Sequence, residues 1–191
     1  MDIRSQRTKQ AISECFLELL RDKPAARITV TELCAGASIN RATFYKHYLD
    51  VADLQSSLEQ ELLREFETFL QDYQCAGEGK YRQILADVLE YFQRCGARFY
   101  QLCSENAGSE LPAATFRLFY RFTFPILQRE LPHGQVQQAD LLYRFLTHGC
   151  GALLVCWLRG DHPMPAQAMA DFMMTLCSAA VGAVSGREQE G

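Results

Sequence analysis

Apolar side chains recur along this chain with the three- to four-residue spacing of helices, and alternating strand patterns are essentially absent. A first helix is predicted from about Ser5 to Arg21, with Pro24 ending it. A second helix is expected to begin after Thr29, because Thr29 and Glu32 have the spacing of a capping box. The apolar face of the first helix consists of Ala11, Ile12, Cys15, Phe16, Leu19 and Leu20.

Breaking and capping residues then divide the rest of the chain into further helices. Gly36 is expected to end the second helix, and either Ser38 or Asn40 to cap a third that carries residues 41–47. Asp50 is expected to cap a long fourth helix. The later helices are expected at 81–94, followed by a bend at Gly96 and a short helical piece to about 103, and at 111–130 with a kink at Pro125, 137–158 and 165–184. The chain is therefore predicted to be all-α.

Charge separates the first fifty residues from the remainder. Residues 1–50 carry eight Lys and Arg against six Asp and Glu, whereas the remainder carries eleven against seventeen, which gives the net charge of −4. A basic end on an acidic body suits a protein that presents one face to DNA. We expect a DNA-binding domain at 1–50, a helical dimerisation and ligand-binding domain at 51–186 and a disordered tail at 187–191.

Between Ile28 and Tyr48, two short helices joined by a glycine-containing turn have the layout of a helix-turn-helix. An apolar core beneath the second helix would hold its first residues outward, toward a major groove. Asn40 and Arg41 have side chains that bond base edges. The candidates for phosphate contacts are Thr43, Tyr45, Lys46 and His47. The alternative is that these are solvated polar residues on an ordinary pair of short helices.

The run from Ile28 to Tyr48 closely resembles the DNA-binding signature of the tetracycline-repressor (TetR) family. The similarity begins around Arg7 and continues through Leu54, and its most specific part is Thr43-Phe44-Tyr45-Lys46-His47-Tyr48. The segment Gly36-Ala37-Ser38-Ile39 is one residue longer than the family's usual turn, so the position of the cap is open by one residue.

This resemblance implies a homodimer of all-helical subunits whose recognition helices enter the major grooves of a near-palindromic operator. Carried over by position, the DNA-contact candidates are Thr29, Arg41, Thr43, Tyr45, Lys46 and His47. Phe44 is expected in the core, and Tyr48 is expected either to pack or to contact phosphate. Double-stranded DNA and a second copy of the chain are thus the expected partners.

Two apolar stripes near the C-terminus suggest a four-helix interface between two subunits. The predicted interface residues are Phe145, Gly149, Leu153, Trp157, Met169, Phe172, Met173 and Leu176. The alternative is that both stripes pack within one subunit. We favour dimerisation because a helix-turn-helix unit needs a partner to read two half-sites.

Aromatic side chains in the second half of the chain could line a cavity for an apolar or aromatic inducer. The candidate pocket residues are Phe92, Tyr100, Phe116, Phe119, Tyr120 and Phe124. Aromatic residues at helical spacing equally form an ordinary core, and both alternatives stay open.

No enzyme motif, metal-ligand spacing or cofactor-binding loop is present in the sequence. The eight cysteines are expected to be reduced thiols, and Cys75 and Cys103 are the ones placed best for redox sensing. Neither a signal peptide nor a run of about 20 apolar residues is evident, which favours a soluble cytoplasmic protein without membrane contact.

Taken together, the sequence favours a dimeric DNA-binding transcriptional regulator, and a repressor in particular, released by a small ligand. The alternative is a TetR-like interaction protein or coactivator that works through a protein partner.

Overall fold

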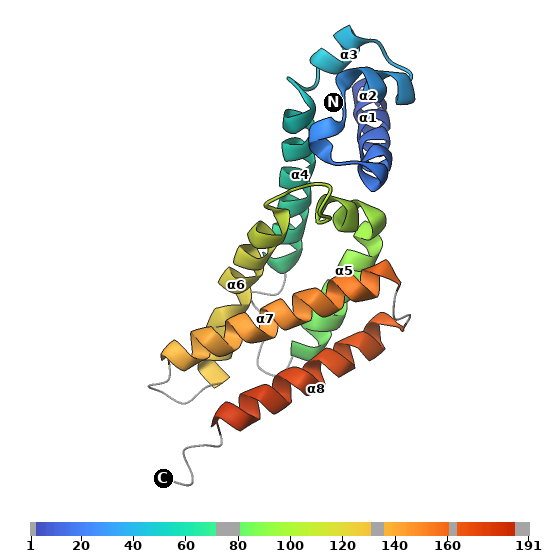
Figure 1. Cartoon of the computed structure of the whole chain (residues 1–191). Coiled ribbons are helices and arrows are strands. Elements are labelled where there is room, and N and C mark those ends of the chain that lie inside the picture. The colour runs from blue at the N-terminus through green and yellow to red at the C-terminus, as the bar shows by residue number, and fades with distance from the viewer. Residues whose placement is uncertain (1–2, 72–80, 131–135, 161–163, 186–191) are drawn as a thin grey trace. The chain divides into compact units, whose positions relative to one another are not determined.

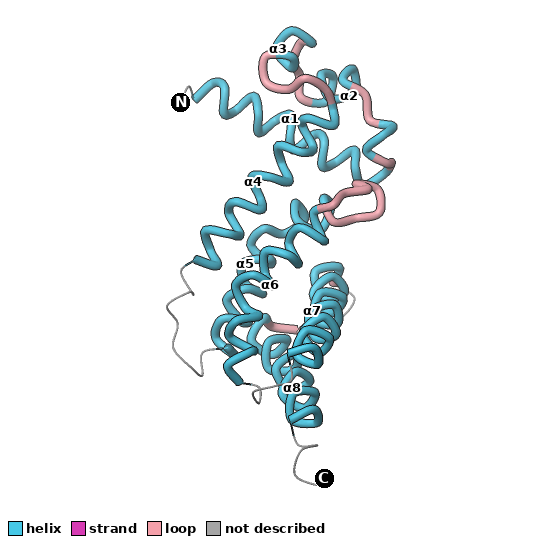
Figure 2. The backbone as a smooth tube through the Cα atoms, turned by 90° about the vertical axis from the view of Figure 1, so that its left-hand side faces the viewer, coloured by secondary structure: helices cyan, strands magenta, loops and turns pink. Residues whose placement is uncertain are grey.

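A computed structural model describes residues 3–71, 81–130, 136–160 and 164–185, and all regular structure in these ranges is helical (Figures 1 and 2). In chain order the elements are α1 (Ile3–Asp22), a short 3-10 helix η1 (Ala25–Arg27), α2 (Val30–Gly36), α3 (Arg41–Tyr45), α4 (Val51–Gln71), α5 (Tyr81–Leu102), α6 (Leu111–Glu130), α7 (Val136–Arg159) and α8 (Ala166–Ser185). The predicted all-α class is confirmed.

The predicted bounds of α1, α6, α7 and α8 agree with the structure to within two residues. Helix α6 continues through position 125 as one element. The tail at 187–191, Cys75 and the turn at 132–134 lie outside the described residues.

The chain divides into two compact units, and neither is one continuous segment. The head unit comprises Met1–Phe66 and Ala97–Ala114, and the body unit comprises Glu67–Gly96 and Thr115–Gly191. One division falls at Gly96, whose φ of 53° and ψ of −137° interrupt α5 and confirm the predicted bend. Glycine suits this position because other residues rarely adopt such a backbone conformation. The head unit thus extends beyond residues 1–50, the range expected from the sequence.

The head unit has a core built by α1, α2, α3 and the first part of α4. Most apolar side chains of α1 and α2 that face this core are buried, Leu19 and Val30 are partly buried, and Phe44 of α3 has no exposed surface. The buried set comprises Ile12, Cys15, Phe16, Leu20, Ile28, Leu33, Cys34, Phe44, Tyr48, Leu54, Leu58 and Leu62. This core fixes α3 with its opposite side facing solvent.

Asn106, in the loop between α5 and α6, forms hydrogen bonds with the end of α1 and with η1. Its side-chain amide donates to the carbonyl oxygens of Leu20 and Arg21, at 3.0 and 3.3 Å, and its own carbonyl accepts from the backbone N–H of Ala25 at 2.8 Å. The Gln55 amide adds a 3.0 Å hydrogen bond to the carbonyl of Ala107. Because the last carbonyls of a helix lack partners within it, Asn106 satisfies the end of α1 with a residue remote in sequence.

Gly36 lies where α2 approaches α1. A β-carbon at this position would collide with the sulfur of Cys15, which is buried on α1. The left-handed residue in the turn that follows is Ser38, with φ of 54°. The glycine is therefore needed for close approach of the two helices, and the turn itself is made by Ser38.

We expect Gly36→Ala to lower the free energy of unfolding by about 1–3 kcal/mol, the usual cost of overpacking a core. Cys15→Ala in the same chain should restore much of this loss, because it removes the sulfur that the new methyl meets. Urea denaturation of the two single variants and the double variant measures the coupling. Additive losses in the double variant would show that the contact between positions 15 and 36 is not the cause.

The body unit has a core between α5, α7 and α8. Its buried members are Ala86, Leu89, Trp157, Ala166, Met169, Ala170 and Met173. The Trp157 indole donates through Nε1 to the carbonyl of Met164 at 2.8 Å, so its one polar group is satisfied inside the same subunit.

Candidate nucleic-acid interface

The start of α2 is held by the predicted capping box. The backbone N–H of Glu32 donates to Thr29 Oγ1 at 3.3 Å, and the backbone N–H of Thr29 donates to Glu32 Oε2 at 3.0 Å. The other carboxylate oxygen lies 2.5 Å from Lys23 Nζ. The hydrogen bond from Lys23, aided by those from Thr29, lowers the pKa of Glu32 to about 2. Thr29, proposed as a DNA contact, thus also has a structural role in capping α2.

Asn40 is the residue that caps α3, which resolves the choice between Ser38 and Asn40. Its Oδ1 accepts from the Thr43 backbone N–H at 2.7 Å and from Thr43 Oγ1 at 2.9 Å. The expected helix over 41–47 is too long, because α3 ends at Tyr45 and the N–H groups of His47 and Tyr48 both turn back to the Phe44 carbonyl. The cap uses the Asn40 oxygen, so only its amide nitrogen stays available to a base edge.

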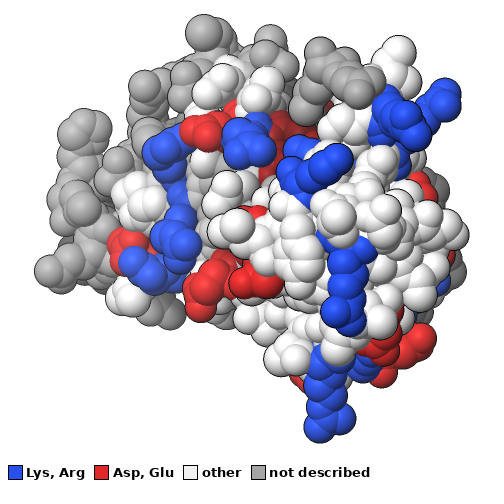
Figure 3. All heavy atoms as spheres, turned by 90° about the horizontal axis from the view of Figure 1, so that it is seen from above, with Lys and Arg blue, Asp and Glu red and all other residues white. Residues whose placement is uncertain are grey.

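The outward side of α3 presents Arg41, Tyr45 and Lys46, all of them exposed. Tyr45 is 55% exposed while its ring meets Phe44 edge-on, with 5.6 Å between ring centroids. Thr43 and His47 are partly buried. Figure 3 looks onto the end of the molecule where α3 lies and shows Lys and Arg side chains there, with some acidic ones between them.

The Arg41 guanidinium donates to Thr31 Oγ1 of α2 at 2.6 Å. This hydrogen bond orients a long cationic side chain across the turn between the two helices. The role of Thr31 was not predictable from the sequence, because a contact between residues ten positions apart leaves no local signal.

Tyr48 is 6% exposed and shares a side-chain hydrogen bond with Ser13 of α1. Burial raises the pKa of its phenol. Of the two roles left open for Tyr48, its position favours packing over phosphate contact.

The six candidate pocket residues are divided between the two units, and ring contacts join Phe116, Tyr120 and Phe124. Tyr100 belongs to the head unit, and the others belong to the body unit. Phe92 is buried against Tyr91, and Phe119 is half-buried. The remaining three form a cluster on α6 and α7 with two further rings, and its members are Phe116, Tyr120, Phe124, Tyr143 and His148.

This aromatic cluster has one polar edge. Tyr120 stacks on Phe124 with 4.6 Å between centroids, and its hydroxyl donates to Asp140 Oδ1 at 2.9 Å. Arg144 Nε donates to the other oxygen of Asp140 at 2.8 Å, and this hydrogen bond with that of Tyr120 lowers the pKa of Asp140. The rings contact one another closely, as in a packed core.

The predicted dimer residues separate into two groups. Phe145, Gly149, Phe172 and Leu176 are exposed, and Leu153 is half-buried against the body core. Trp157, Met169 and Met173 are buried in their own subunit's core and leave little surface for a partner. The apolar stripe of α8 is wide: Met169 and Met173 on one edge pack in the body core, while Phe172 and Leu176 on the other edge are exposed to solvent.

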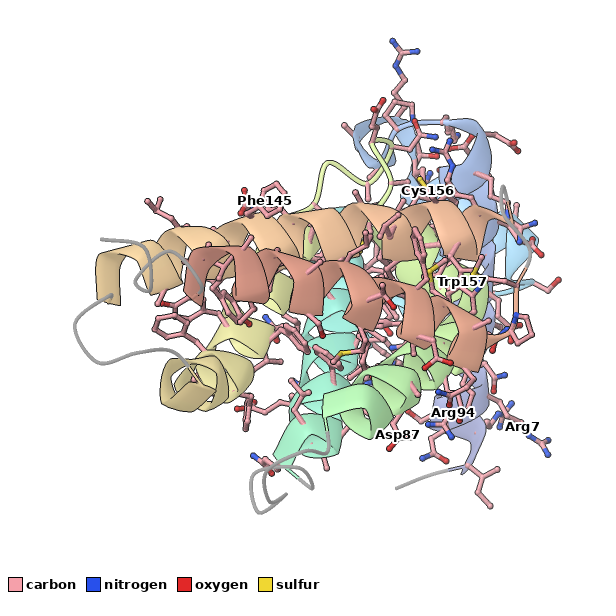
Figure 4. All side chains as sticks on the ribbon, turned by 90° about the horizontal axis from the view of Figure 1, so that it is seen from below. Arg7, Asp87, Arg94, Phe145, Cys156 and Trp157 are labelled. Atoms are coloured by element: carbon pink, nitrogen blue, oxygen red, sulfur yellow. The ribbon has the colours of Figure 1, made fainter. Side chains whose placement is uncertain are left out.

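We define the outer face of α7 and α8 as one stripe of exposed apolar and small residues on each helix of this pair. They are Leu141, Phe145, Gly149, Ala152 and Cys156 on α7 and Phe172, Leu176, Ala179 and Ala183 on α8. Figure 4 shows Phe145 and Cys156 projecting from α7 on the side away from α8, while Trp157 lies between the helices.

By length and composition alone, both helices are long and apolar enough to cross a membrane, at Ala139–Arg159 and Ala166–Val184, which is weak evidence for a membrane span. Only 17% of each apolar window is buried within the chain. The apolar residues that these helices leave exposed are a candidate contact surface for a second subunit.

Cys103 is a poor redox sensor, contrary to the expectation from its position near a helix end. Burial, aided by the nearby charge of Glu59, raises the pKa of its thiol to about 12. Because the thiolate is the reactive form, this cysteine is held in its unreactive state at neutral pH.

A capped pair of short helices, a cationic outward side and an all-helical body define a helix-turn-helix regulator of transcription. Residues 80–179, just over half of the chain, match the family profile described as the transcriptional regulator C-terminal region of TetR proteins. The chain therefore belongs to the TetR family of transcriptional regulators, DNA-binding proteins that are not enzymes.

Relatives agree with this assignment. Over 61 residues, or 31% of this chain, the sequence is 36% identical to the uncharacterized HTH-type transcriptional regulator YxbF of Bacillus subtilis (strain 168). That match spans only 16% of the length of YxbF.

Solved structures of similar fold cover nearly the whole chain. A TetR transcriptional regulator from Streptococcus agalactiae 2603V is 22% identical, with a TM-score of 0.65 and coverage of 91% of this chain and 95% of that one. NalD, the secondary repressor of the MexAB-OprM multidrug efflux pump in Pseudomonas aeruginosa, is 18% identical, with a TM-score of 0.66 and coverage of 93% and 98%. The dihydroxyacetone kinase operon activator DhaS is 14% identical, with a TM-score of 0.57 and coverage of 92% and 97%. These likenesses establish the fold.

Proposed function

We propose that this protein is a homodimeric repressor, acting in the cytoplasm, that binds a palindromic operator through α3. The observation that carries the proposal is the arrangement of Arg41, Tyr45 and Lys46 on the solvent side of a helix whose opposite side is anchored by the fully buried Phe44. In this arrangement Arg41 is the base-reading residue, and Tyr45 and Lys46 are the phosphate-binding residues.

Fluorescence anisotropy on DNA from upstream of the protein's own gene tests the proposal. We expect saturable binding, two subunits per palindrome and a steep dependence on salt, because phosphate contacts release counterions. Weak binding that is equal on scrambled DNA would instead favour the coactivator function, in which a protein partner supplies specificity.

Variants of α3 separate the two kinds of contact. Lys46→Ala should weaken binding on all sequences and reduce the salt slope by about one. Arg41→Ala should cost roughly 1–3 kcal/mol on the matched site and relax sequence preference there. Arg117→Ala, which removes an exposed cation from the body unit, is the control and should bind normally. If neither α3 variant differs from this control, α3 is not the recognition helix.

Repression is the regulatory sign we propose. NalD is described as a repressor and DhaS as an activator, so the shared fold is compatible with either sign. A reporter fused to the bound promoter decides: deletion of the regulator should raise expression, and a fall would show activation.

We further propose that a small apolar or aromatic ligand releases the DNA, and that it binds beside Phe116, Tyr120 and Phe124. Such a ligand must bind the DNA-free state more tightly, because only differential affinity shifts the equilibrium. Its effect would be measured as displacement of the labelled operator in the same anisotropy assay.

A further inference from the structure

Cys150 of α7 and Cys177 of α8 bring two free thiols together in the body unit. Their sulfur atoms are 3.7 Å apart, within hydrogen-bonding distance for sulfur, although 27 residues separate them in sequence. Both side chains are half-buried, and Cys150 packs against the core formed by Trp157, Met169 and Met173.

We propose that Cys150 and Cys177 form a dithiol that a peroxide oxidises to an intrachain disulfide between α7 and α8. A disulfide requires the two sulfurs to come about 2.05 Å apart, so they must approach by about 1.7 Å. Rotation about the Cα–Cβ bond moves a cysteine sulfur while its helix stays in place. This proposal does not depend on DNA binding or on the repressor function.

Either sulfur can donate in the hydrogen bond between the thiols. When Cys150 donates, the hydrogen bond lowers the pKa of Cys177, and with burial it raises the pKa of Cys150. Cys177 is therefore the thiol that more readily becomes the attacking thiolate, and Cys150 is the resolving thiol.

The chemistry proceeds in two balanced steps. The Cys177 thiolate attacks one peroxide oxygen, an S–O bond forms as the O–O bond breaks, and the departing hydroxide takes up a proton to give water. Cys150 then attacks the sulfenic sulfur of Cys177, an S–S bond forms as the S–O bond breaks, and the second hydroxide leaves as water with the proton of Cys150. Two thiols are oxidised and one hydrogen peroxide is reduced.

Peptide mapping of the purified full-length protein after treatment with hydrogen peroxide tests this assignment. Trypsin releases residues 145–159, which contain Cys150 and Cys156, and residues 160–187, which contain Cys177 alone. We expect these peptides to be joined in chains that run as monomers on a non-reducing gel. Two thiols per chain should be lost, and Tm should rise, because a cross-link restricts the unfolded chain.

Cysteine-to-serine variants provide the matched controls. Cys156→Ser leaves Cys150 as the single thiol of its peptide and should keep the cross-link. Cys150→Ser and Cys177→Ser should each abolish it. If either of these fails to fold, the Cys156→Ser protein alone still decides. Absence of the cross-link in that protein, or separate oxidation of its two thiols to sulfinic acids, would overturn the proposal.

Discussion

Placing a charge on the outer face of α7 and α8 should convert the protein to monomers and abolish operator binding. Phe145 is 72% exposed and Leu176 is 48% exposed in the single subunit, which are unusual fractions for such large apolar side chains on long helices. The neighbouring Gly149 and Ala152 leave room for a second helix to approach closely. We expect Phe145→Glu and Leu176→Glu each to weaken the dimer by at least about 100-fold, because an unpaired carboxylate would be buried at the contact.

Sedimentation velocity across a range of concentrations measures this effect, and anisotropy on the operator measures its consequence. Ile3→Glu is the matched control, since Ile3 is a 67% exposed apolar residue on α1 of the head unit. Its mass distribution should match that of the parent protein. Dimers that persist in both glutamate variants would place the subunit contact on another surface.

Phe44→Ala should cost about 3–5 kcal/mol of stability, the range found when a buried phenylalanine is truncated. Phe44 is fully buried, and it anchors both Tyr45 and Tyr48 through ring contacts of 5.6 and 5.8 Å. A loss of this size is comparable to the whole stability of a small domain. We therefore expect the α1–α3 region to unfold locally and DNA binding to disappear with it.

Hydrogen exchange resolved by segment is the measurement for Phe44→Ala, because it separates the head unit from the body unit. Protection should fall in α1, α2 and α3, while α7 and α8 keep theirs. Tyr45→Ala is the companion variant: it removes an exposed ring, so protection should stay normal while DNA affinity falls. Equal protection in both variants would mean that Phe44 does not organise the head.

Features that depend on residues within about four positions were predicted well from sequence. The capping box of Thr29 and Glu32 and the bend at Gly96 are of this kind, since each is determined by local backbone and side-chain chemistry. The exposure of the proposed DNA-contact residues Arg41, Tyr45 and Lys46 followed for the same reason, because Phe44 is buried on the opposite side of α3.

Features that depend on distant partners were not predictable in this way. The periodicity of α7 and α8 identified apolar stripes, but it could not decide that Trp157 and Met173 face their own subunit while Phe172 faces outward. The hydrogen bonds of Asn106 to the end of α1 join residues 85 or more positions apart, and no local pattern encodes them.

Because the head unit consists of two segments that are separate in sequence, its operator preference cannot be moved to a relative as one continuous fragment. A chimera made by a single crossover near Phe66 would carry α1–α3 from one parent and the segment Ala97–Ala114 from the other. Asn106 would then meet α1 and η1 of the other parent, and its two hydrogen bonds to α1 and one to η1 would form only if the two parents were compatible there. A chimera that takes its operator preference from one parent should therefore carry both Met1–Phe66 and Ala97–Ala114 of that parent. Recombination that exchanges both segments together should yield folded protein more often than a single crossover.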